Sequence, residues 1–402
     1  NGTVEVASLA VSGTSAINTA NITTTGDQTY GDEVRLGKDA ILTGSIVTFN
    51  NKVIGDSNSL SITGDTVFGD EDTDTITGVN ELTVTGTSTI NADITTTGTQ
   101  TYTGAVTLGG ANVELTAKNV SNELQTVTFS ASIDGAKDLT IEGDAVFGNS
   151  ADDTVTGVKE LKVTGASTIN TTTITTTGAQ TYTGAVTLGA DTTFTADSGS
   201  LVRFGSTVTG DSSARSLTVT TANAQFDGVV SGNISTVNII GTSTINADIT
   251  TTGDQTYEGD VTLGIDITLT ATDGSDNLQT VIFSASIDGD GNSLTIEGNA
   301  VFGNDVNDTV TEVNELVVSG TSIINTANIT TTGDQTYTGA VTLGVDTTLT
   351  GSTVTFTNTV GNTSSRTLAI TGNAVFGNTV GAGTALTSLS VSGTSTINTT
   401  TI

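Results

Sequence analysis

Apolar and polar residues alternate over short stretches along almost the whole chain. LTVTG at 82–86, AVTLG at 105–109 and SLTVT at 216–220 each place Leu or Val at every second position, with Thr between them. A period of two over four or five residues, bounded by Gly, Asn or Asp, is typical of short β-strands with one buried face. No stretch carries a helical period, and 48 glycines with many β-branched residues disfavour helix. The pattern predicts an all-β protein.

These strands belong to a long internal repeat. Copies of TTTG begin at Thr23, Thr95, Thr175, Thr250 and Thr330, at the spacing typical of repeat architectures built from several short elements. We assign the repeats to 23–94, 95–174, 175–249, 250–329 and 330–402, with 1–22 as the end of a preceding repeat. A Tyr in QTY and a Phe, usually in VFG, recur in each repeat and are predicted to fill the core: Tyr30, Tyr102, Tyr182, Tyr257, Tyr337, Phe68, Phe147, Phe226, Phe302 and Phe376.

A shorter period lies inside the long one. Tyr30, Phe49 and Phe68 follow one another at equal intervals. Three short strands and three turns fit into such an interval of about 18–20 residues, which is one coil of a parallel β-helix, or β-solenoid. We therefore predict one continuous solenoid over 1–402, with about four coils per repeat. The Tyr would occupy one slot in every fourth coil, with its hydroxyl reaching water or a backbone group.

A string of small β-sandwich domains is the competing fold, because a repeat of this length could form one small immunoglobulin-like domain. The shorter period, the very short strands and the absence of Trp and Pro favour the solenoid.

Composition excludes several classes of function. The chain has no His and no Cys, so it lacks Ser-His and Cys-His nucleophile pairs and His- or thiolate-bound zinc and iron. Its net charge of −32 predicts repulsion from nucleic acids and anionic membranes. No apolar run is long enough to span a bilayer, so we expect no membrane insertion by this segment. The carboxylates recur with the repeat and the cations are scattered, so we expect no enzyme.

Acidic clusters are the strongest candidates for a binding site. The stretch GDEDTDTITG at 69–78 contains Asp70, Glu71, Asp72 and Asp74. Calcium prefers several oxygen ligands at close range, and such a loop can supply them. A solvated turn that keeps the surface soluble is the simpler interpretation. Calcium is the one cofactor that the sequence offers, with these four residues as its candidate ligands.

TTTGDQTYTGAVTLG at 330–344, LTVTGTSTIN at 82–91 and NAVFGNTV at 373–380 resemble the Thr/Gly-rich β-strand repeats of large exported bacterial surface proteins, similar to filamentous-haemagglutinin-type adhesins. The resemblance covers nearly the whole chain. It implies a right-handed β-helix, secretion across a bacterial envelope, and a role in adhesion, biofilm or a surface fibre. The secretion domain and the receptor-binding regions of that family have no counterpart here, so no functional residue is carried over.

The combined interpretation is the shaft of an extracellular bacterial surface fibre that associates with copies of itself. The sequence starts and stops within a repeat, which suggests a segment of a longer chain. The alternative is the monomeric stalk of a large adhesin whose binding tip lies elsewhere, or tandem β-sandwich adhesin repeats.

Overall fold

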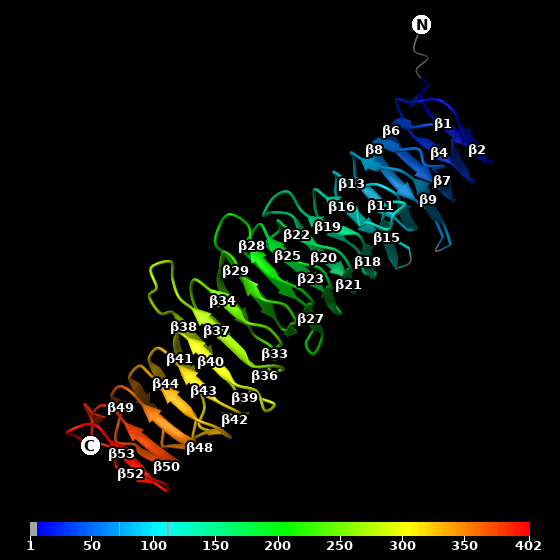
Figure 1. Cartoon of the computed structure of the whole chain (residues 1–402). Coiled ribbons are helices and arrows are strands. Elements are labelled where there is room, and N and C mark those ends of the chain that lie inside the picture. The colour runs from blue at the N-terminus through cyan, green and yellow to red at the C-terminus, as the bar shows by residue number, and fades with distance from the viewer. Residues whose placement is uncertain (1–5, 72, 111) are drawn as a thin grey trace. The chain divides into compact units, whose positions relative to one another are not determined.

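The structure is a computed structural model that describes residues 6–71, 73–110 and 112–402. All regular elements among these residues are β-strands, and no helix is present among them. The chain divides into two compact units, Asn1–Gly205 and Ser206–Ile402. Within each unit the strands of successive coils pair in parallel and form three faces (Figure 1). The predicted all-β parallel solenoid is confirmed.

Each face of unit 1 is named by the Tyr that it contains. The Tyr30 face comprises β1 (Leu9–Val11), β4 (Gln28–Tyr30), the second halves of β6 (Ala40–Phe49) and β8 (Leu60–Phe68), β11 (Ser88–Ile90), β14 (Val106–Leu108), β17 (Ile133–Asp134), β20 (Thr154–Val158), β23 (Thr173–Thr176) and β26 (Thr192–Thr195). The Tyr182 face comprises β2 (Ser15–Ile17), β5 (Val34–Leu36), β7 (Val53–Ile54), β9 (Thr75–Val79), β12 (Asp93–Thr96), β15 (Val113–Ala117), β18 (Leu139–Glu142), β21 (Leu161–Val163), β24 (Gln180–Tyr182) and β27 (Leu201–Phe204). The Tyr102 face comprises β3 (Asn21–Thr23), the first halves of β6 and β8, β10 (Leu82–Val84), β13 (Gln100–Tyr102), β16 (Thr126–Phe129), β19 (Asp144–Phe147), β22 (Ser167–Ile169) and β25 (Val186–Leu188).

Unit 2 is built in the same way. Its Tyr257 face comprises β29 (Arg215–Thr220), β32 (Ile234–Ile239), β35 (Gln255–Tyr257), β38 (Thr280–Phe283), β41 (Asn299–Phe302), β44 (Ser322–Ile324), β47 (Val341–Leu343), β49 (Val360–Asn362) and β51 (Val380–Ala382). Its Phe226 face comprises β30 (Asn223–Phe226), β33 (Ser243–Ile245), β36 (Val261–Leu263), β39 (Ile287–Asp288), β42 (Thr309–Val313), β45 (Asn328–Thr331), the first halves of β48 (Thr347–Phe356) and β50 (Thr367–Phe376), and β52 (Ser388–Val391). Its Tyr337 face comprises β28 (Val208–Gly210), β31 (Val230–Ser231), β34 (Ile249–Thr251), β37 (Ile267–Ala271), β40 (Leu294–Glu297), β43 (Leu316–Val318), β46 (Gln335–Tyr337), the second halves of β48 and β50, and β53 (Ser395–Ile397).

The core runs along the inside of the coils as columns of apolar side chains. In short strands such as β4 and β10 the outer two side chains are buried and the central one faces outward, because neighbouring side chains of a strand point to opposite faces. In the Tyr30 column, Tyr30 pairs with Phe49 and Phe49 with Phe68, so the shorter sequence period equals one coil. The coil from Tyr102 to its partner Phe129 is longer. Its extra residues form a hairpin arm closed by the antiparallel bridge between Lys118 and Leu124.

The long repeat does not contain a whole number of coils. Tyr102, Tyr182, Tyr257 and Tyr337 lie on β13, β24, β35 and β46, so successive tyrosines are eleven strands apart. Twelve strands would complete four three-stranded coils. Each repeat therefore stops one strand short, and within unit 1 the three tyrosines fall on three different faces. The expected slot in every fourth coil is replaced by a slot that moves to another face with each repeat.

Glycine forms a column of its own where the Tyr102 face turns into the Tyr30 face. Gly44, Gly64, Gly86 and Gly104 lie at this corner in four successive coils. A Cβ added to Gly104 would lie 2.4 Å from the Gly86 carbonyl oxygen and 2.5 Å from its carbon. The atoms in the way are backbone atoms, which rotamer changes cannot move. The glycine of TYTG is thus required by the close approach of stacked coils.

Gly104→Ala is expected to lower the free energy of unfolding by about 1–3 kcal/mol, the usual cost of forcing atoms into packed space. Gly274→Ala is the matched control, because nothing lies within 4 Å of its added Cβ. Thermal melting followed by circular dichroism checks both variants. Equal melting temperatures for the two would contradict the proposed role of the glycine column.

Candidate functional site

The QTY segment of each repeat forms a buried polar cluster at a corner of the coil. In the second repeat, Gln100 is fully buried, and its Nε2 donates hydrogen bonds to the carbonyl oxygens of Ile94 at 3.2 Å and Thr116 at 3.0 Å. The Tyr102 hydroxyl donates to Gln100 Oε1 at 2.9 Å. The same bond from Tyr to Gln occurs in the other four repeats. The repeated tyrosine is thus part of a structural cluster.

The cluster corrects one expectation. The Tyr hydroxyl reaches neither water nor the backbone, because the Gln side chain two residues earlier accepts its hydrogen bond. Ile94 and Thr116 lie on β12 and β15, which pair in adjacent coils, so Gln100 also ties two coils together. Thr96 completes the corner by donating from Oγ1 to the Gly98 carbonyl oxygen at 2.7 Å. Together these contacts account for the Thr, Gly, Gln and Tyr of TTTGxQTY.

The aromatic residues predicted for the core are all buried, with at most 1% of the surface of each exposed. They form stacks along the columns. Tyr102 stacks on Phe129 with ring centroids 5.5 Å apart, and Phe129 stacks on Phe147 at 5.9 Å. The stacks are spaced by the coil rise and serve packing. Tyr30, the first ring of its stack, also lines a cavity.

The acidic loop at 69–74 is organised by its own last carboxylate. Asp74 is 5% exposed, and its Oδ2 accepts hydrogen bonds from the backbone N–H groups of Asp70 and Glu71, both at 3.0 Å. Asp153 and Asp308 close the equivalent loops in the same way. One candidate calcium ligand is therefore a loop cap.

The side chains of Asp70 and Glu71 are exposed to solvent, and Asp72 lies outside the described residues. No group of three or more acidic side chains close enough to hold a metal ion occurs in the part of the chain that the structure describes. Calcium stays a prediction, and no described contact supports it.

Many other carboxylates bond to the backbone of the next coil. Asp93 Oδ1 accepts the N–H of Glu114 at 2.8 Å, and Asp248 Oδ1 accepts the N–H of Thr268 at 2.8 Å. Asn91 has a related role, since its Nδ2 donates to the Gly69 carbonyl oxygen at 2.8 Å. Much of the acidity of the chain is thus tied to corners, where Asp and Asn satisfy backbone groups that the strands leave unpaired.

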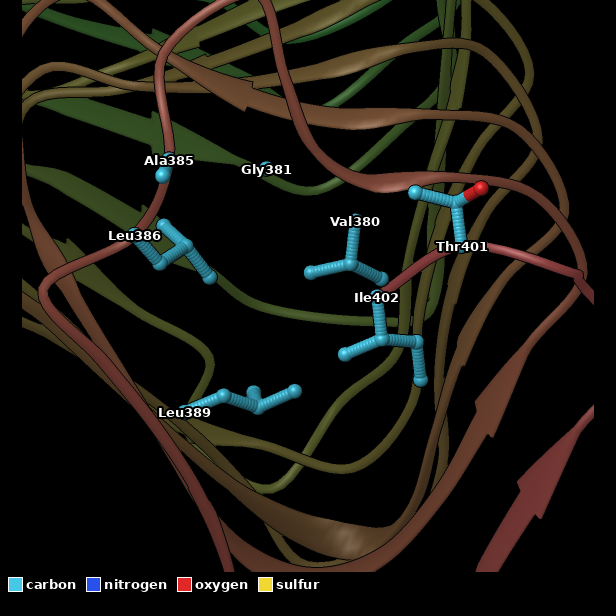
Figure 2. A pocket seen from close by; sticks show the side chains of 7 residues that line it. All are labelled: Val380, Gly381, Ala385, Leu386, Leu389, Thr401 and Ile402. Atoms are coloured by element: carbon cyan, nitrogen blue, oxygen red, sulfur yellow. The ribbon is translucent and has the colours of Figure 1, made fainter.

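Each unit contains a cavity that opens into its coil interior. One of about 390 Å³ in unit 2 is lined by Val380, Gly381, Ala385, Leu386, Leu389, Thr401 and Ile402. Figure 2 shows the side chains of Leu386, Leu389 and Ile402 reaching into this space. The other, of about 570 Å³ in unit 1, is lined by residues that include Leu9, Val11 and Tyr30. Neither lining contains an acidic or basic side chain, so neither cavity resembles a catalytic site.

Comparison of the chain with protein-family models, with curated proteins and with solved structures finds no match. The resemblance to exported bacterial surface repeats therefore stays a prediction. No helix among the described residues is long and apolar enough to cross a membrane. The sequence had identified the repeated tyrosines and acidic loops. The role of the glutamine was not predicted, although a Gln stands two residues before each of the five tyrosines.

Burial raises the pKa of Tyr30 to about 12 and raises the pKa of the other four tyrosines well above the ordinary value for tyrosine. An unfolded Tyr ionises near pH 10, so the unfolded state loses protons first as the pH rises. Stability is therefore full below about pH 10 and falls as the pH rises toward 12. In a spectrophotometric titration, we expect little phenolate absorbance from the folded protein at about pH 11. Normal titration of even one tyrosine in the folded protein would contradict the burial of all five.

The Gln–Tyr contact can be tested by a double-mutant cycle. Gln100→Leu should lower the free energy of unfolding by about 1–3 kcal/mol, because the buried Tyr102 hydroxyl loses its acceptor. Adding Tyr102→Phe removes that stranded donor, so the double variant should be more stable than the sum of the two single effects predicts. Urea denaturation of the four proteins measures the coupling. Strict additivity would mean that the two side chains do not interact.

Proposed function

We propose that the chain is the structural shaft of an extracellular bacterial surface fibre that associates with copies of itself and contributes to adhesion, biofilm or the cell-surface matrix. The proposal rests on one observation above the others. Several recurring residues, namely the Gln of QTY, the corner glycines, and Asp and Asn residues such as Asp93 and Asn91, make contacts between coils. A chain whose repeated residues hold its coils together is suited to a mechanical and spatial role.

The proposed role is not enzymatic. Catalytic sites usually break the pattern of a scaffold with residues that occur once. In this chain the buried Gln and Tyr side chains recur in each repeat with the same hydrogen bond between them. The bacterial origin and the extracellular location are supported by the resemblance of TTTGDQTYTGAVTLG and its copies to exported surface repeats.

Self-association predicts growth that depends on concentration. We expect the purified chain to form filaments or bundles above a critical concentration, visible by negative-stain electron microscopy and as a fast boundary in sedimentation velocity. Heat-unfolded chain at the same concentration is the control for non-specific aggregation. Single particles of one size at every concentration would reject the self-associating shaft and favour the monomeric stalk.

A further inference from the structure

One corner of the repeat keeps the same hydrogen bond between coils in both units but carries different charges, and its first loop is one residue longer in unit 2 (288–294) than in unit 1 (134–139). In unit 1 it lies between β17 and β18 and, one coil later, between β20 and β21; there the Lys159 N–H donates to the Lys137 carbonyl oxygen at 2.9 Å. In unit 2 it lies between β39 and β40 and between β42 and β43; there the Asn314 N–H donates to the Asn292 carbonyl oxygen at 2.8 Å. This shared hydrogen bond makes Lys137 equivalent to Asn292 and Lys159 equivalent to Asn314.

The copy of the corner in the second repeat carries three lysines, Lys137, Lys159 and Lys162, which we call the lysine edge. The first-repeat copy, where the Asn80 N–H donates to the Asn58 carbonyl oxygen at 2.9 Å, carries Asp56 and Glu81 and no lysine. Lys159 lies 3.5 Å from Asp138, and 58% of its side chain is exposed. Lys162 is exposed on the outer side of β21. Neither Lys137 nor Lys162 forms an ion pair with a described residue. The three lysines balance the three carboxylates of the corner, Asp134, Asp138 and Glu160, and the exposed Lys159 and Lys162 present positive charge to solvent.

In unit 2 the equivalent corner carries only negative charge, and we call Asp290, Glu312, Glu315 and Asp334 the acidic edge. All four are exposed. The positions of Lys159 and Lys162 hold Asn314 and Val317 here, and the chain has no Lys or Arg between Arg215 and Arg366. Nothing in the sequence around this corner neutralises it.

Two further differences in sequence place carboxylates at this corner in unit 2. Glu312 has a φ of 55°, where the equivalent Gly157 has 71°. Asp334 stands where unit 1 has Ala179, because their carbonyl oxygens accept the equivalent N–H groups of Leu316 and Leu161. Glu315 and Asp334 precede the paired residues Leu316 and Gln335, so their like charges lie about one strand spacing apart, roughly 4.8 Å at the backbone. The two edges thus differ in charge at several equivalent positions.

We propose that the lysine edge of unit 1 in one copy docks against the acidic edge of unit 2 in a second copy. The inference rests on the proposed self-association and specifies the surface that performs it. Both edges repeat at the strand spacing, so several opposite charges come into contact at once. The contact joins two different surfaces, which leaves each copy with one free edge of each kind and allows open-ended growth.

The net charge of −32 opposes any contact between copies, and the salt concentration sets how this repulsion compares with the attraction between the two edges. At physiological ionic strength the Debye length is about 8 Å, so long-range repulsion is screened while charges in direct contact still attract. Assembly should therefore be strongest at intermediate salt and weaken at both low salt and about 1 M salt. Assembly driven by apolar contacts alone would instead strengthen steadily with salt.

Charge exchange tests the contact. The first variant combines Lys159→Glu with Lys162→Glu, and the second combines Glu312→Lys with Glu315→Lys. A control with the same charge change as the first variant, Lys38→Glu with Lys52→Glu, alters exposed lysines outside the edge. The second variant makes the net charge less negative, so weaker assembly there would not come from general repulsion between copies. Each edge variant alone should raise the critical concentration by roughly tenfold or more, since two attractive pairs become repulsive. The control should assemble like the unmodified chain.

An equimolar mixture of the two edge variants should assemble again, because each then meets an edge of opposite charge. Light scattering and sedimentation velocity measure all five samples, and circular dichroism checks folding. If the unmodified chain assembles and the edge variants match the control, the docking surface is wrong and the fibre function stands. Impaired variants that the mixture does not restore also overturn the pairing of these edges. An unmodified chain that stays monomeric overturns both proposals.

Discussion

The whole structure depends on one spacing, the distance between paired parallel strands. Because each coil lies directly on the previous one, every position meets its own equivalent about 4.8 Å away along the column. A side chain fits into a column only if equivalent side chains can lie one strand spacing apart. Aromatic rings do so by stacking, as Tyr102, Phe129 and Phe147 do with centroids 5.5 and 5.9 Å apart. Gly104 does so by having no Cβ, and Gln100 by bonding to two coils at once.

The eleven-strand repeat changes what this stacking does to the coil. With twelve strands, all the Tyr and Phe stacks of a unit would fill one face, and the smaller Ser, Ala and Thr columns would fill the others. With eleven, Tyr30, Tyr102 and Tyr182 begin stacks on three different faces of unit 1. The Tyr and Phe stacks are thereby shared among the three faces, so no face is consistently wider than its neighbours. Acidic loops and hairpin arms move around the coil with them.

The fold could be predicted from the sequence because a solenoid is determined by local periods. The alternation in LTVTG gives short strands, and the equal spacing of Tyr30, Phe49 and Phe68 gives the coil. The movement of the repeat around the faces was missed, since the strand at Ala40–Phe49 bends across a corner and serves two faces. The turn at Gly44 and Ser45 lies inside one uninterrupted strand, so a search for turn residues between strands does not detect it. The Asp74 cap was missed for a similar reason. A carboxylate facing backbone N–H groups and one facing a cation have the same local sequence.

The charge of the chain follows from the same stacking. Asp93 and Asp248 cap the N–H groups of the next coil, and each such corner adds an exposed or half-exposed carboxylate as a by-product of coil cohesion. Acidity that is shared by equivalent corners therefore says little about partners. Charge that differs between corners with the same inter-coil hydrogen bond does not follow from that hydrogen bond. Gly157 and Glu312 occupy one left-handed position in two copies of a corner, and glycine is the residue that this position favours. The glutamate costs stability there, and coil cohesion gives no reason for it. The glutamate therefore points to a role outside the coil, such as contact with a second copy.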